Sequence, residues 1–66
     1  MDERYLQLLL QKLEEQKQAS INAMVDGQHK DYAEYRSGCG VVRGLALAQR
    51  EINDLLRKMK EKQNED

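Results

Sequence analysis

The residues best suited to chemistry in this sequence are its single cysteine, Cys39, and its single histidine, His29. A cysteine nucleophile needs a base beside it, but this histidine lies ten residues earlier, before the expected start of the helix that carries the cysteine. One cysteine and one histidine also cannot supply the four ligands of a structural zinc site. These residues therefore predict no enzyme, no metal and no cofactor, and Cys39 is expected to pack as a small apolar residue.

Glycines at 38, 40 and 44 are the next unusual feature. They do not form a credible phosphate-binding loop, because the Gly-x-Gly lies inside an expected helix with no preceding strand. Each costs a helix roughly 1 kcal/mol relative to alanine. Gly40, Gly44 and Ala48 are four apart and would form a ridge almost without side chains, where a second backbone could approach closely. Two alternatives stay open: the segment is the hairpin's own core, or the glycines form a loop that splits the helix.

Four arginines at a spacing of seven form a third candidate, on one side of the expected second helix: Arg36, Arg43, Arg50 and Arg57. One hypothesis is a basic strip for an acidic protein or a phosphate backbone. The simpler interpretation is a solvated face with ion pairs four residues apart. Arg43 has apolar sequence neighbours, and we expect it to pair with Glu14 or Glu15.

Two helices are expected to position these residues. The first should span about 2–25, with Asp2 and Glu3 at its positive end. A turn at 26–30 contains Gly27, a second helix begins near Asp31 and continues to about 62, and 63–66 form a frayed tail. The fold class is therefore all-α, an antiparallel two-helix hairpin in one domain, 1–66, that assembles into a helical-bundle oligomer.

The second helix carries the clearest apolar periodicity, with spacings of four and three. Its seam consists of Val41, Leu45, Ala48, Ile52, Leu55 and Met59, with Leu56 beside it. Residues that face each other across a turn near His29 should have numbers that total about 57. Leu55, Leu56 and Met59 would then lie at or beyond the start of the first helix, where another subunit would most simply cover them. The expected interface is Gly40, Val41, Gly44, Leu45, Ala48, Ile52, Leu55, Leu56 and Met59.

Size and charge narrow the class of protein. A chain of 66 residues buries little surface by itself, and without disulfides or metal the usual remedy is oligomerisation. The charges of the 11 basic and 12 acidic residues nearly cancel, so we do not expect nucleic acid as a partner. No apolar stretch approaches the roughly 18 residues of a membrane span, and Met1-Asp2-Glu3 does not begin a signal peptide. We expect a soluble protein.

A longer pattern resembles a known group of proteins. It reads Tyr32-x-x-Tyr35-Arg36-x-x-Cys39-Gly40-x-x-Arg43-Gly44-Leu45-x-x-Ala48 and continues to Ile52-x-Asp54-Leu55-Leu56. Over roughly the second half of the chain it is similar to small uncharacterised helical proteins of tailed bacteriophages. The resemblance implies a component of the virion or of its assembly, found in the host cytoplasm or the virion, with other copies or other virion proteins as partners. It carries no catalytic residue.

Two other functions stay open. The chain could be a small phage-encoded inhibitor or regulator whose exposed seam binds a groove of a host protein, such as a defence factor or a polymerase. It could also be a nucleic-acid-binding dimer that uses the four arginines.

Overall fold

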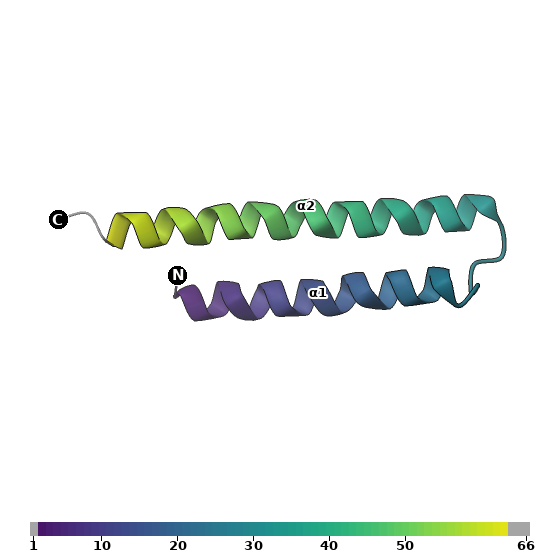
Figure 1. Ribbon diagram of the computed structural model, residues 1–66, viewed down its shortest axis with the longest axis horizontal. Helices are drawn as coiled ribbons and strands as arrows, with labels where there is room; N and C mark the ends of the chain where they lie inside the picture. The colour runs from purple at the N-terminus through teal and green to yellow at the C-terminus, as the bar shows by residue number, and fades with distance from the viewer. Residues whose placement is uncertain (1, 64–66) are drawn as a thin grey trace.

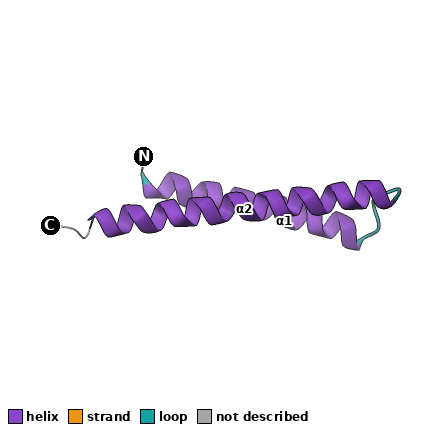
Figure 2. Ribbon diagram, turned by 90° about the horizontal axis from the view of Figure 1, so that it is seen from above, coloured by secondary structure: helices purple, strands orange, loops and turns teal. Residues whose placement is uncertain are grey.

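The structure, a computed structural model, describes residues 2–63. Helix α1 spans Glu3–Val25 and helix α2 spans Tyr32–Gln63. They lie side by side in opposite directions (Figure 1) and cross at a shallow angle (Figure 2). The expected all-α two-helix hairpin is therefore confirmed. Of the frayed tail expected at 63–66, Gln63 is the last residue of α2, and the others lie outside the described residues.

Local side-chain contacts begin both helices. Asp2 caps α1, because its carboxylate accepts a hydrogen bond from the backbone N–H of Arg4 at 2.9 Å. Asp31 does the same for α2, accepting from the N–H of Glu34 at 2.8 Å. The Glu34 carboxylate in turn accepts from the N–H of Lys30 at 3.1 Å. Together these bonds satisfy amide groups that the first turn of a helix would leave unpaired.

Gly27 ends α1. Its φ of 70° lies in the left-handed region, which glycine adopts without a steric penalty. The N–H groups of Gly27 and Gln28 bond back to the carbonyls of Met24 and Ala23 at 3.3 and 3.0 Å, so the last turn of α1 is closed by backbone bonds.

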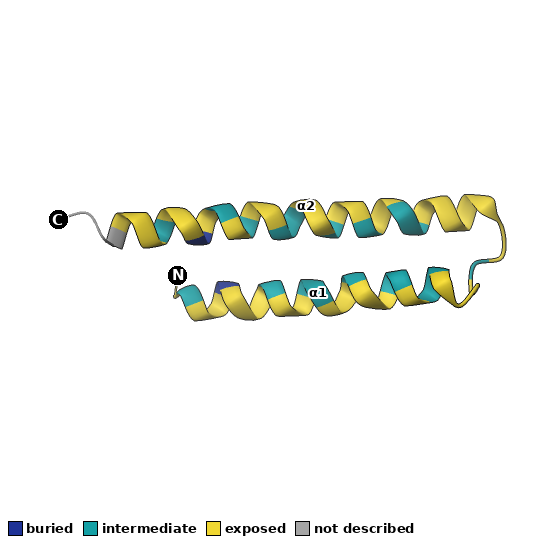
Figure 3. Cartoon of the chain, viewed as in Figure 1, coloured by how far each residue is buried: buried dark blue, intermediate teal, exposed yellow. Residues whose placement is uncertain are grey.

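The core between the helices is thin. Among the described residues only Leu6 and Leu56 are buried, at 6% and 7% exposure (Figure 3). The remaining apolar residues that line the seam are half-buried: Leu10, Leu13 and Met24 on α1, and Val42, Leu45, Ile52 and Met59 on α2. Large apolar side chains of a typical single-domain core are more completely enclosed than this.

The register of the hairpin differs from our expectation. Glu14 lies opposite Gln49, and Met24 opposite Gly38, so facing residue numbers total 63 and 62 rather than 57. The difference arises because the link at 26–31 runs on past the end of α1 before the chain reverses. Helix α2 therefore begins beyond the end of α1, and it also continues beyond the start of α1 (Figure 1). Of the three residues expected to be uncovered, Leu56 is consequently buried inside one hairpin and Met59 is half-buried, whereas Leu55 is 48% exposed.

The face of α2 that packs on α1 also differs. Two residues of the expected seam, Val41 and Leu55, remain 50% and 48% exposed. The residues that face α1 instead are the next ones in the sequence, Val42 and Leu56, together with Gln49 midway between them. The expected series of Val41, Ala48 and Leu55 and the observed series of Val42, Gln49 and Leu56 both repeat every seven residues. Apolar periodicity favours the expected series, because its middle residue is alanine and not glutamine. Gln49 is drawn inwards because it has a polar partner on α1.

Candidate protein interface

The glycine-rich segment is helical throughout. Helix α2 passes through Gly38, Gly40 and Gly44 without interruption, so the alternative in which they form a loop is wrong. Gly38 faces inwards: a Cβ there would lie 3.2 Å from Nε2 of His29 and 3.4 Å from Cγ of Met24. A Cβ at Gly40 or Gly44 would meet nothing within 4 Å. Close approach within the hairpin therefore occurs at Gly38, and the other two glycines are open.

The residues expected to form an interface divide into three groups. Gly40, Val41, Gly44 and Leu55 are exposed. Leu45, Ala48, Ile52 and Met59 are half-buried, and Leu56 is buried in the hairpin. The exposed residues, together with the half-buried Ala48, form the surface of α2 that another molecule could contact.

Among the described residues, one side-chain hydrogen bond joins the two helices, between Glu14 of α1 and Gln49 of α2. The Gln49 amide donates to Glu14 Oε2 at 2.8 Å, while Lys17 and Gln18 approach the same carboxylate at 3.0 and 3.3 Å. These donors, Gln49 first, lower the pKa of Glu14 from its ordinary 4.5 to about 2. The expected contact of Arg43 with Glu14 or Glu15 is wrong, because Arg43 is exposed in the observed register and Gln49 lies opposite Glu14 instead.

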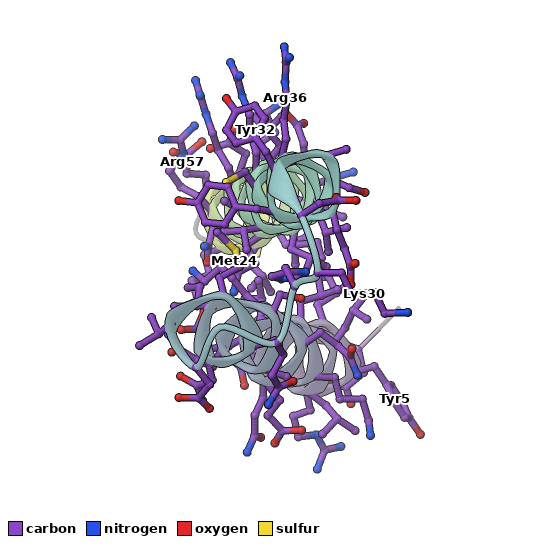
Figure 4. The ribbon with its side chains drawn as sticks, turned by 90° about the vertical axis from the view of Figure 1, so that its right-hand side faces the viewer. Tyr5, Met24, Lys30, Tyr32, Arg36 and Arg57 are labelled. Carbon is purple, nitrogen blue, oxygen red and sulfur yellow. The ribbon has the colours of Figure 1, made fainter. Side chains whose placement is uncertain are left out.

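All four arginines at the spacing of seven are exposed. Arg36 points away from α1 (Figure 4). Arg57 lies 3.6 Å from Asp54 and 4.0 Å from Glu61, and its side chain is 66% exposed. Ion pairs this exposed contribute little to stability.

A shallow hollow of about 360 Å³ lies between the helices near the turn. Most of the residues that line it are small, and His29, Glu34 and Val41 complete the lining: Ala19, Ser20, Ala23, Ser37 and Gly38. The imidazole of His29 is packed against Gly38, and its Nδ1 lies 3.6 Å from Glu34 Oε1. Neither this hollow nor the inward position of Gln49 was predicted from the sequence. The signal for the hollow was the run of small residues late in α1, opposite Gly38.

Cys39, the single cysteine, has Tyr35 as a titratable neighbour. Cys39 lies beside Tyr35 and raises the pKa of that phenol above its ordinary 10.0, through charge repulsion and then a hydrogen bond. Tyr35 also stacks with Tyr32, with ring centroids 6.4 Å apart.

Within residues 2–63, no three His, Cys, Asp or Glu side chains are grouped closely enough to hold a metal ion. Neither described helix has an apolar stretch that could cross a bilayer.

Comparison with protein-family models, with curated proteins and with solved structures finds no match for this chain.

Proposed function

We propose that this chain is a non-enzymatic protein–protein interaction module that self-associates through α2 into a helical bundle. The thinness of the hairpin core is the observation that carries the proposal. Only Leu6 and Leu56 are buried among the described residues, whereas Val41, Leu47 and Leu55 on α2 are about half exposed. Burial of such side chains by a second molecule removes apolar surface from water and stabilises both partners.

Size supports the same proposal. A hairpin of 66 residues has no second layer to cover the outer surface of α2, and the lone Cys39 cannot form an internal disulfide. Chains of this size commonly reach adequate stability by oligomerisation. Pairs of antiparallel helices with a heptad repeat associate readily into four-helix bundles, because each pair offers a long apolar face.

Sedimentation velocity at low micromolar concentration tests the proposal. We expect an oligomer, and a thermal midpoint that rises with protein concentration because folding and association are coupled. A compact monomer, fully helical and with a midpoint independent of concentration, would contradict self-association.

A substitution at Gly44 sharpens this test. A Cβ at Gly44 meets nothing within the hairpin, so Gly44→Leu leaves the hairpin itself free of clashes. In an assembly it overpacks the contact with the neighbour, at a cost of about 1 to 3 kcal/mol. We expect weaker association with unchanged helix content by circular dichroism, and Gly44→Ala is the matched control. Equal association by both variants would mean that Gly44 faces water.

For the biological setting we propose a component of a phage virion or of its assembly, and this rests on the resemblance of the second half of the chain. Mass spectrometry of purified particles, or of assembly intermediates, tests it, with the chain expected at many copies. Recovery of the chain bound to one host protein, and its absence from particles and intermediates, would favour a host-directed regulator instead.

A further inference from the structure

We infer that the partner of α2 is a second copy of the same hairpin, bound in the opposite direction about a two-fold axis that passes beside Ala48. The inference rests on the proposed self-association and adds the face, the direction and the register. The resulting dimer is a four-helix bundle in which α2 packs on the partner's α2 and α1 packs on the partner's α1.

The first observation is which residues share the face with the hollow. Val41 lines the hollow, and residues at a spacing of seven from it lie on the same side of α2. These are Glu34, which also lines the hollow, and Ala48, Leu55 and Lys62. On α1, Ala23 lines the hollow, and Leu9, two heptads earlier, shares its side. Val41, Leu55 and Leu9 are 50%, 48% and 43% exposed, so these apolar positions are uncovered in the single hairpin, while the exposed Gln16 lies between Leu9 and Ala23 in the series on α1.

The second observation is that this series is symmetric about Ala48. Val41 and Leu55 lie seven residues to either side of it, and Glu34 and Lys62 lie fourteen. When a second α2 runs in the opposite direction past Ala48, each Val41 meets a Leu55 and each Glu34 meets a Lys62. A parallel arrangement would place Glu34 against Glu34 and Lys62 against Lys62. Charge complementarity therefore selects the antiparallel direction.

The third observation concerns shape. The hollow at the turn end is lined by Ala19, Ala23 and Gly38, whereas the other end of the face carries Leu9 and Leu55. In the observed register Ala48 lies level with residue 14 of α1. Reversal about that level brings the second copy's Leu9 to the position of Ala19 and its Leu55 to that of Val41. The large side chains of each copy thus enter the hollow of the other copy. The small residue Ala48 lies at the two-fold axis, where the two α2 helices meet.

The size of the face is adequate for such a dimer. The extents of the hairpin, 56 by 16 Å, set the outer limit of this face, and that limit is of the same order as the roughly 800 Å² that each partner buries in a stable complex. The two copies use the same surface patch, as a closed two-fold dimer requires. Gly40 and Leu47 lie about a quarter of a turn around α2 from Ala48 and are not part of this contact.

Disulfide cross-linking tests face, direction and register together. In a Cys39→Ser background, Ala48→Cys is expected to form a covalent dimer under mild oxidation, because the two positions meet at the axis. Val41→Cys and Leu55→Cys should each remain monomeric on a non-reducing gel and should cross-link when the two variants are mixed. Leu47→Cys, one residue from the axis position but about a quarter of a turn around α2, is the matched control and should not cross-link.

Other outcomes overturn the inference in separate ways. If Val41→Cys and Leu55→Cys each cross-link with themselves, the copies are parallel. If Leu47→Cys cross-links and Ala48→Cys does not, the two copies meet through a different face of α2. In both cases sedimentation still reports a dimer, so the proposed self-association survives. A monomer by sedimentation, with no cross-linking anywhere, removes both.

A charge reversal tests the end of the series. Lys62→Glu places like charges opposite each other at Glu34 and is expected to weaken dimerisation, most clearly at low salt. Lys60→Glu makes the same change of charge on another side of α2 and should have a smaller effect. Equal weakening by the two variants would contradict the pairing of Glu34 with Lys62.

Discussion

Glu14 shows how one polar side chain can determine which residues of a helix face inwards. Its carboxylate collects hydrogen bonds from Gln49, Lys17 and Gln18, and the first of these crosses to the other helix. Because Gln49 must face α1 to make this bond, the residues seven before and after it, Val42 and Leu56, face α1 as well. The polar pair therefore orients α2 about its own axis, in addition to whatever it contributes to stability.

The lowered pKa of Glu14 makes a prediction about pH. The carboxyl titrates at about 2 in the folded chain against 4.5 ordinarily, so its contribution to stability is present above pH 4.5 and is lost as the pH falls towards 2. We expect the thermal midpoint to fall across this window. Gln49→Ala, which removes the largest cause of the shift, should make the fall smaller. The control is Gln18→Ala, which removes the smallest of the three hydrogen-bond contributions.

Thermal unfolding followed by circular dichroism from pH 6 to about pH 2 measures this effect. Identical pH profiles for Gln49→Ala and the unchanged chain would mean that the Glu14–Gln49 bond does not hold the carboxylate.

At the scale of the helices, the neighbouring leucines Leu55 and Leu56 have different surroundings. Leu56 is 7% exposed and packs inside the hairpin, whereas Leu55 is 48% exposed on its outer side. We expect Leu56→Ala to lower the free energy of unfolding by about 2 kcal/mol or more at any protein concentration. Leu55→Ala should lower the thermal midpoint only where the protein associates.

Thermal unfolding at a low and a high protein concentration distinguishes the two leucines, since only association depends on concentration. An equal loss of stability in Leu55→Ala at both concentrations would show that this side chain belongs to the hairpin core.

The helices themselves could be predicted from sequence because their ends carry local signals. Asp2 and Asp31 are capping residues by type, and Gly27 suits the left-handed end of a helix. The register could not be predicted in this way, since it depends on how far the link at 26–31 continues before the chain reverses. Nor could the inner face of α2, because the choice between Ala48 and Gln49 depends on Glu14, a residue 35 positions away.

At the scale of the whole molecule, charge and apolar surface lie on different sides of α2. The four arginines at the spacing of seven are exposed, and Arg36 points away from α1. The apolar series through Val41, Ala48 and Leu55 occupies another side of the same helix. An assembly formed through the apolar series would therefore carry its arginines outside.

This separation predicts the effect of removing the arginine charges. Replacement of Arg36, Arg43, Arg50 and Arg57 by Gln should leave the thermal midpoint and the sedimentation coefficient nearly unchanged, because exposed ion pairs contribute little. Gel retardation with duplex DNA at low salt provides the second measurement, and we expect no binding by either protein. Salt-dependent binding that is lost in the Gln variant would instead support a nucleic-acid-binding dimer.

Both described ends of the chain, Asp2 and Gln63, lie at the pole of the hairpin away from the turn (Figure 1). Two hairpins that run in opposite directions would therefore present their termini at opposite poles. In the inferred register Asp2 of one copy lies level with about residue 36 of the other copy's α2, so roughly 40 Å separates it from that copy's Gln63 at the helical rise of 1.5 Å per residue. A tandem gene that encodes both copies in one polypeptide would need a spacer of roughly 12 extended residues to cross that length. With a shorter spacer the fused copies could reach only the copies of other polypeptides, and the product would be an open chain of linked bundles.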